Sequence, residues 1–169
     1  MLKIGLISDT HSHLDPKIFE VFKDVDEIWH AGDIGNPDVA EKLKKFKPLY
    51  AVYGNIDGRE IRQDYPLNLE LEREGLKILM THIGGYPGHY EPKAKRKIEE
   101  VKPNIFICGH SHILKVMRDE KYNNMLAINP GAAGIEGFHK VKTVLRFSLN
   151  KGKVENMEAV ELGKRGAIV

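Results

Sequence analysis

Seven side chains of types that bind metal ions follow five apolar stretches of the sequence. They are Asp9, His11, Asp33, Asn55, His82, His110 and His112. Each apolar stretch has the β-rich composition of a strand, and ligands in open α/β sheets bind beyond the carboxyl ends of the strands. The sequence therefore predicts that these seven side chains converge on one site.

The chemistry of this set favours metal ions. It contains two carboxylates, one amide and four imidazoles, and no thiolate. Mixed oxygen and nitrogen ligands suit borderline first-row metals, so we expect divalent ions, with Mn²⁺ ahead of Ni²⁺, Fe²⁺, Co²⁺ and Zn²⁺. Seven side chains exceed the needs of one tetrahedral ion but suit two ions about 3.5–4 Å apart that share a carboxylate. Such a pair serves in-line displacement at phosphorus.

Three of these motifs also contain a glycine beside the ligand, at Gly32, Gly54 and Gly109. Glycine permits backbone conformations that other residues avoid, and it lets the backbone approach a neighbouring group closely. We expect both properties to matter where five strand ends meet.

The first half of the chain alternates strand-like with helix-like segments. Asn36-Pro37 has the pattern of an N-cap followed by proline at the first helical position. The expected strands are 2–8, 27–31 and 49–53, and the expected helices are 15–23 and 37–46. This βαβαβ order predicts a mainly parallel sheet with helices on its faces.

The second half is richer in strands. We expect a hairpin of 67–72 with 76–81, a helix over 92–101, and strands over 104–108, 114–118, 125–128, 143–149 and 154–160. The predicted fold is α/β, a two-sheet mixed β-sandwich flanked by helices, with the metal site at the carboxyl ends of its strands. Residues 1–169 are predicted to form a single domain, in which the final segment 163–169 is a loosely held tail.

Composition limits the partners and the location. The net charge of +2 provides no electrostatic case for a dedicated nucleic-acid surface or for membrane binding. The single cysteine excludes an internal disulfide, and neither a secretory signal nor a membrane-spanning run is seen, so we expect a cytoplasmic protein. The expected partner is a small-molecule phosphoester, and an exposed strand edge could pair two copies into a homo-oligomer.

The motifs Asp9-x-His11, Gly32-Asp33, Gly54-Asn55, His82 and Gly109-His110-x-His112 resemble the signature of the calcineurin-like metallophosphoesterase superfamily. The resemblance covers residues 9 to 112 with every ligand in order. The short chain and its Asn129-Pro130-Gly131 turn are similar to the small single-domain phosphodiesterases related to the retromer subunit of the same fold.

This resemblance implies a role for each ligand. One metal would be held by Asp9, His11, Asp33 and His112, and the second by Asp33, Asn55, His82 and His110. Asp33 would bridge the two, because its two oxygens can each face a cation. A metal-bridging hydroxide would then attack the phosphate ester, so no covalent protein nucleophile is expected.

One position departs from the pattern. Many members of the superfamily have histidine after the Gly-Asn pair, where this chain has Ile56. Isoleucine cannot protonate a leaving group, which favours a phosphodiester substrate and leaves His89 and Asp57 as candidates for the acid. We expect Asn55 and His89 to contact the substrate.

Two other functions are weighed against this hypothesis. A phosphomonoesterase or nucleotidase of the same fold would need extra cations for a dianion, and only Arg59 and Arg62 follow the Asn55 motif. A non-catalytic scaffold subunit tolerates the loss of ligands, but none is missing here.

Several residues have a simpler structural interpretation. We expect His30 to be a buried histidine with one satisfied hydrogen bond, or else a support for a ligand. His13 is expected at the rim, His139 to be structural or exposed, and Cys108 in the core. The basic residues 93–97 are expected to form a solvated helix face rather than a phosphate site. The 84–88 loop is either a simple turn or a rim facing the substrate.

Overall fold

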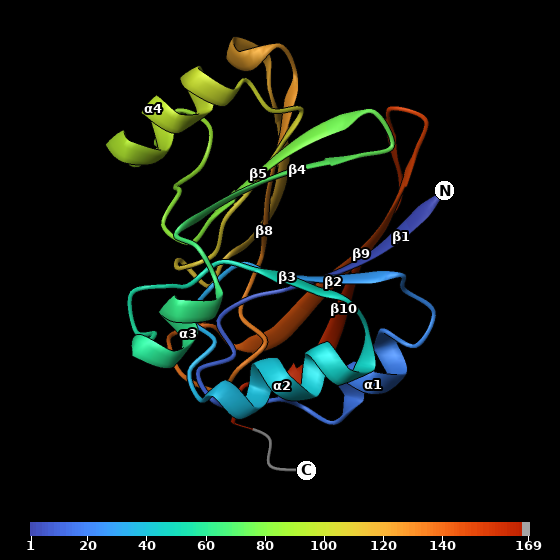
Figure 1. The fold of residues 1–169 in the computed structure, drawn as a ribbon, viewed down its shortest axis with the longest axis vertical. Coiled ribbons are helices and arrows are strands. Elements are labelled where there is room, and N and C mark those ends of the chain that lie inside the picture. The colour runs from blue at the N-terminus through green and yellow to red at the C-terminus, as the bar shows by residue number, and fades with distance from the viewer. Residues whose placement is uncertain (167–169) are drawn as a thin grey trace.

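The computed structural model of the chain describes residues 1–166, which form two five-stranded sheets with helices on their outer faces (Figure 1). Sheet A has the order β10-β9-β1-β2-β3 and sheet B the order β4-β5-β6-β8-β7. The strands are β1 (Leu2–Ile7), β2 (Glu27–His30), β3 (Leu49–Ala51), β4 (Asn68–Arg73), β5 (Leu76–Thr81), β6 (Ile105–Ile107), β7 (Leu114–Asp119), β8 (Met125–Pro130), β9 (Val141–Asn150) and β10 (Lys153–Lys164). The predicted α/β sandwich is confirmed.

Each sheet mixes parallel and antiparallel pairs. In sheet A, β1, β2 and β3 are parallel, and β9 adds to the other side of β1 in the antiparallel sense. In sheet B, β5, β6 and β8 are parallel, and antiparallel β4 and β7 form its two edges. The parallel strands of both sheets end at the same side of the molecule, which is where the predicted ligands lie.

Strand alternation divides the apolar residues among three layers. One face of each sheet meets the other sheet, and Leu6, Trp29, Ile78 and Phe147 are fully or almost fully buried there. The outer face of sheet A packs under α1 (Lys17–Val21) and α2 (Pro37–Phe46). The outer face of sheet B packs under α4 (Pro92–Val101). Burial on both faces explains why these strands are nearly continuous in apolar residues.

The helices begin at the expected signals. Asn36 accepts a hydrogen bond from the backbone N–H of Asp38, and Glu91 caps α4 in the same way. The short helix α3 (Arg59–Asp64) was not predicted, because only one of its residues, Ile61, is buried and no apolar period marks it. A 3-10 turn, η1 (Glu120–Tyr122), links β7 to β8.

The prediction for the C-terminal tail is wrong at its start. Gly163 and Lys164 belong to β10, where they pair with Lys142 and Val141 of β9. Residues 167–169 lie outside the described part of the chain. Within residues 1–166, no helix is long and apolar enough to cross a membrane.

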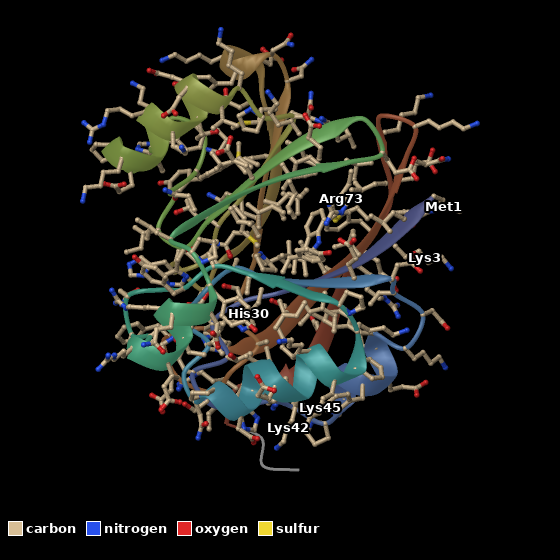
Figure 2. All side chains as sticks on the ribbon, in the orientation of Figure 1. Met1, Lys3, His30, Lys42, Lys45 and Arg73 are labelled. Atoms are coloured by element: carbon tan, nitrogen blue, oxygen red, sulfur yellow. The ribbon has the colours of Figure 1, made fainter. Side chains whose placement is uncertain are left out.

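At the end of the sandwich opposite the predicted ligands, an ion pair links the two sheets. Arg73 lies between them in Figure 2, and its Nε donates to Glu27 Oε1 at 3.1 Å. The Arg73 guanidinium also stacks on the Tyr50 ring at 4.8 Å. Hairpin β4–β5 is thereby fastened to β2 and β3.

A second ion pair is fully buried and provides a test of the packing. Lys142 Nζ lies 2.7 Å from Asp15 Oδ2, with both side chains only 1% exposed. Lys142→Met leaves the Asp15 carboxylate buried without its cation, so we expect the free energy of unfolding to fall by about 3–5 kcal/mol in urea titrations.

The double variant Asp15→Asn/Lys142→Met should lose less free energy of unfolding than Lys142→Met alone, because no charged side chain stays buried without a partner. Burial alone raises the pKa of Asp15, but Lys142 outweighs it and holds that pKa below its ordinary value. The stabilisation by this pair is therefore fully present at pH values above the ordinary pKa of an aspartate, and it is lost as the pH falls through the lowered pKa of Asp15. A single variant as stable as the wild type would contradict this account.

Candidate metal centre

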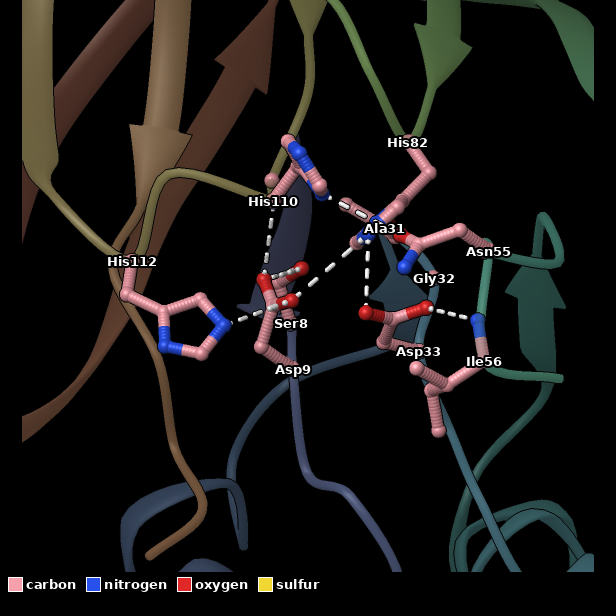
Figure 3. Close-up of polar contacts among 12 residues, drawn as sticks. Ser8, Asp9, Ala31, Gly32, Asp33, Asn55, Ile56, His82, His110 and His112 are labelled. Carbon is pink, nitrogen blue, oxygen red and sulfur yellow. Dashed lines mark hydrogen bonds and ion pairs between the residues drawn. The ribbon is translucent and has the colours of Figure 1, made fainter. Parts of the chain in front are cut away.

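The structure brings the predicted ligands together where the strands of both sheets end (Figure 3). The contributing segments follow β1, β2, β3, β5 and β6. Six of the side chains form two groups whose ligand atoms lie within 4.8 Å of one another; one group is Asp9, His11 and His112, and the other is Asp33, His82 and His110. The groups correspond to the two predicted sets, except that Asp33, predicted in both, falls in the second group and Asn55 is in neither.

The seventh ligand type, Asn55, lies beside the second group. Its Oδ1 is 3.1 Å from His110 Nδ1, a spacing that suits either a hydrogen bond or two neighbouring ligands of one ion. Both side chains belong to exposed residues. They could therefore receive a metal ion and a substrate from solvent.

The atoms that face the centre lack hydrogen-bond partners. Within residues 1–166, Asp9 Oδ1, His11 Nε2 and His82 Nε2 are buried without one. The two imidazole nitrogens nevertheless lie 3.1–3.7 Å from Asp9 and Asp33 oxygens. Burying a polar atom without a hydrogen-bond partner costs free energy. These nitrogen and oxygen atoms lie close together without forming hydrogen bonds, an arrangement that suits lone pairs directed at a shared cation. The residues present therefore fit divalent metal ions.

Each carboxylate directs one oxygen into the centre and is anchored by the other. Asp33 Oδ1 accepts the backbone N–H of Ile56 at 3.0 Å, and Oδ2 lies 3.3 Å from His11 Nε2 and 3.1 Å from His82 Nε2. Asp33 therefore stands between the two groups. Only Oδ2 faces histidines of both groups, because Oδ1 is held by the Ile56 N–H.

The charges of the centre shift the pKa values of its members. Burial raises the pKa of Asp9 and Asp33, but the histidines around them outweigh burial and hold both well below the ordinary range. Contact with Asp33, and next with Asp9, raises the pKa of His11 to about 10. In the absence of a cation the centre therefore attracts protons, as a site built for positive charge should.

The ligands themselves hold strained backbone conformations. Positive φ angles occur at Asp9 (53°), His11 (44°), Asp33 (56°), His110 (70°) and His112 (63°). Such conformations cost about 1–3 kcal/mol each and occur at functional sites. The glycines had been expected to supply the unusual conformations, and Gly32 does so with a φ of 100°.

Gly54 and Gly109 serve close approach instead. A Cβ at Gly54 would collide with the Asp33 carboxylate, and one at Gly109 would collide with Ser8 Oγ and Asp9 Oδ2. The neighbouring strand ends can therefore reach the two acidic ligands only because side chains are absent there.

Asp57 organises two of the ligand loops. Its Oδ2 accepts the backbone N–H groups of Ile34 (3.1 Å) and Gly54 (2.8 Å), and its Oδ1 accepts that of Gly35 (2.7 Å). A buried carboxylate with three such donors is committed to structure. Its proposed role as the acid for the leaving group is therefore corrected.

His30 has a similar supporting role and lies on the helix-covered side of sheet A (Figure 2). Its Nδ1 accepts the N–H of Gly32 at 3.1 Å, so in the neutral ring Nε2–H donates to Thr10 Oγ1 at 3.0 Å. The Thr10 hydroxyl can then donate to the Ile34 carbonyl. Burial lowers the pKa of His30 to about 4, which keeps the ring neutral. His30 is therefore buried as expected, but it makes two hydrogen bonds rather than one, and both support segments that carry candidate ligands.

Two ligand histidines have their tautomers set by neighbours. His82 Nδ1 lies 2.8 Å from the Ala31 carbonyl, which can only accept, so Nε2 keeps its lone pair for the centre. His139 Nε2 similarly donates to the Gly134 carbonyl at 2.7 Å. In neutral His139, Nδ1 then accepts from His112 Nδ1 at 3.2 Å, and His112 Nε2 is left to face Asp9. Such partners orient metal-binding histidines.

Asn129 also shapes the centre. A turn was expected over residues 129–131, but Asn129 and Pro130 are the last two residues of β8. Asn129 Nδ2 donates to the Gly109 carbonyl and to Ser111 Oγ, both at 3.0 Å. This side chain therefore holds the loop that presents His110 and His112. Neither these contacts of Asn129 nor the role of His139 was predicted from the sequence.

The remaining expectations are settled by position. Cys108 is buried, and burial raises its pKa to about 12, so it is a core residue. Lys93, Lys95 and Arg96 are exposed on α4, as expected for a solvated face. His13 is half-buried, and exposed His89 lies in the loop after β5, with its ring centroid 4.8 Å from that of Tyr86.

Residues 2–152 match the family model described as the calcineurin-like phosphoesterase superfamily domain. With this fold and donor set, the chain belongs to that superfamily, which confirms the resemblance seen in its motifs.

Individual relatives agree with this assignment. A phosphodiesterase of Methanocaldococcus jannaschii is 30% identical over 146 residues, which cover 77% of this chain and 83% of that protein. The solved structure of a novel archaeal phosphodiesterase is similar with a TM-score of 0.76 at 25% identity, covering 95% of this chain and 100% of that one. A Vps29 single mutant from Entamoeba histolytica has a TM-score of 0.73 at 18% identity, covering 96% and 100%, and shares the fold.

The contact of His139 with His112 leads to a prediction about metal affinity. His139→Ala removes the acceptor that sets the tautomer of His112, so the ion held by Asp9, His11 and His112 should bind about 10–100-fold more weakly. The second ion should be affected less. Calorimetric titration with Mn²⁺ measures both affinities.

His13→Ala is the matched control, because His13 lies in the loop after His11 but has no such contact among the described residues. His139→Asn, which keeps a side-chain acceptor, should recover part of the affinity. Equal weakening by His139→Ala and His13→Ala would contradict the assigned role.

The raised pKa of His11 predicts proton release on metal binding. In the metal-free protein His11 keeps its proton below about pH 10, and a cation must displace it. Affinity for Mn²⁺ should therefore rise with pH between about 6 and 9. Calorimetry in two buffers of different ionisation enthalpy counts the protons, and an affinity independent of pH would contradict the prediction.

Proposed function

We propose that the protein is a metal-dependent phosphodiesterase with a dinuclear centre. The observation that carries the proposal is the convergence of two ligand groups on Asp33 Oδ2, with buried oxygen and nitrogen atoms that lack other partners. Two bound divalent ions would supply an activated water and neutralise charge on a phosphate ester. We expect Mn²⁺ as the ion and the cytoplasm as the location.

The residues of the chain have distinct tasks in this proposal. Asp33 would hold both ions, Asp9, His11 and His112 would complete one site, and Asn55, His82 and His110 the other. Asn55 and His110 are on the exposed side of the centre, where the phosphate would enter. Asp57, His30 and His139 position these groups and would not touch the substrate.

The surroundings of the centre favour a diester over a monoester. The 46% exposed side chain of Ile56 stands next to Asn55 and provides neither charge nor proton. Arg62, one of two cations considered for a dianion, donates to the Asp57 and Asn55 carbonyls and stacks on Tyr53 at 4.6 Å. A diester carries one negative charge and therefore needs fewer cationic side chains than a dianionic monoester. The alternative function is a phosphomonoesterase or nucleotidase, and assays of both ester classes distinguish the two.

Asp33→Asn tests the dinuclear assignment. Because Asp33 faces both groups, this change should lower the occupancy of both ions and reduce hydrolysis of bis(p-nitrophenyl) phosphate by at least about 100-fold. Asp9→Asn should mainly deplete one ion. Metal analysis after dialysis, together with steady-state rates, measures both effects.

Equal metal losses in the two variants would count against Asp33 as the bridge. No turnover of diesters or monoesters by wild-type protein with both sites filled would overturn the enzymatic function. The three-dimensional likeness to Vps29 makes a scaffold role the second candidate. Stable co-purification with a large partner, and a cellular function undiminished by Asp33→Asn, would favour that role.

A further inference from the structure

A cavity of about 320 Å³ opens beside the candidate ligand His110. Its walls come from the loop after β5, the loop after β6 and the facing parts of β7 and β8, and we name it the Tyr86 pocket. His110 and Gly109 belong to its wall. The pocket is therefore continuous with the side of the metal centre that holds His82, His110 and Asn55.

The walls of the Tyr86 pocket are apolar and partly exposed. Ile83 is 40% exposed, Tyr86 42% and Ile113 60%, so large apolar surfaces face the opening. Phe106 and Ile128, which are buried, also line the pocket. A well-formed apolar cavity next to a cluster of reactive groups is the usual form of a small-molecule site.

Most polar groups around the pocket are already satisfied by the protein. Glu91 caps α4, and Ser111 Oγ accepts from Asn129 and from the N–H of Ile113. The Cys108 thiol contacts the Gly85 carbonyl. These groups hold the loops and offer little to a polar ligand.

A cation and aromatic rings remain available at the opening. Lys115 Nζ lies 3.8 Å from the centre of the Tyr86 ring, close enough for a cation–π contact. The His89 ring packs against the same tyrosine. The opening therefore combines flat apolar surface with one positive charge, which suits an aromatic group attached to an anion.

We propose that the Tyr86 pocket binds an aromatic ester group of the substrate while its phosphate occupies the metal centre. This inference rests on the proposed phosphodiesterase function and specifies its substrate class, aryl or nucleoside phosphodiesters. The shared His110 wall places the two subsites next to each other. The cavity volume lies at the lower end for ligand pockets, about 300–1,000 Å³, and suits a single ring system.

Binding of two phosphonates to the Mn²⁺-loaded protein tests the pocket without requiring turnover. The monomethyl esters of phenylphosphonic and methylphosphonic acid, called phenylphosphonate and methylphosphonate below, carry the same single negative charge as a phosphodiester, and only the first has a ring. Calorimetry should show phenylphosphonate binding about tenfold or more tightly, because its ring leaves water for an apolar wall.

Variants locate the effect. Tyr86→Ala and Ile113→Ala should each reduce this preference to about threefold or less while methylphosphonate binding stays unchanged. Tyr86→Phe keeps the ring and should keep the preference. Val116→Ala is the matched control. Val116 is 40% exposed on β7, the strand that directly follows Ile113, but it does not line the pocket.

The outcomes separate the two proposals. Equal binding of both phosphonates by the wild type, or a preference that survives Tyr86→Ala and Ile113→Ala, would overturn the Tyr86 pocket and leave the phosphodiesterase function standing. Failure of both phosphonates to bind with both metal sites filled would overturn the proposed function, and the pocket assignment with it. Thermal unfolding checks that each variant is folded, which the exposure of both side chains favours.

Discussion

The structure depends on two carboxylates, Asp9 and Asp33, buried where its two sheets meet. A buried negative charge is stable only with hydrogen bonds and a nearby cation. Each carboxylate has one oxygen fastened to protein donors, by Ser8 and the His110 N–H for Asp9 and by the Ile56 N–H for Asp33. The other oxygen of each faces histidine nitrogens. Positive charge at the centre is thus a condition of the fold as well as of the chemistry.

The surrounding structure meets this constraint with backbone geometry. The acidic ligands and three histidines adopt positive φ, and Gly54 and Gly109 leave room for the neighbouring loops. Asp57 ties two of these loops together through three backbone N–H groups, and Asn129 fastens a third. Strain at the ligands persists because these contacts over-determine the loops. The ends of the parallel strands are therefore rigid where the donors must be placed accurately.

Much of the site could be predicted because ligand types and strand ends are local features of a sequence. Asp9, Asp33 and the histidines each follow an apolar run, and parallel strands bring their carboxyl ends to one edge. The contacts of Asp57, Asn129 and His139 are different, since each joins a loop to a segment 20 to 27 residues away, and no periodic pattern marks such a contact. Helix α3 was missed for a related reason, because it buries only Ile61. The positive φ of the ligands follows from tertiary contacts, so no local rule anticipates it.

The same edge of the sandwich explains why a metal centre and an apolar pocket occur together. The loop after β6 contributes His110 to the centre and Ile113 to the Tyr86 pocket, while the loop after β5 contributes His82 to one and Tyr86 to the other. Two loops on adjacent parallel strands therefore build both the candidate metal centre and the pocket, and the order of residues along each loop sets their separation. In the proposed phosphodiesterase, changes in the outer halves of these loops would alter which ester group is held without moving His82 or His110. Specificity can thus vary independently of the metal centre, which depends on the buried carboxylates.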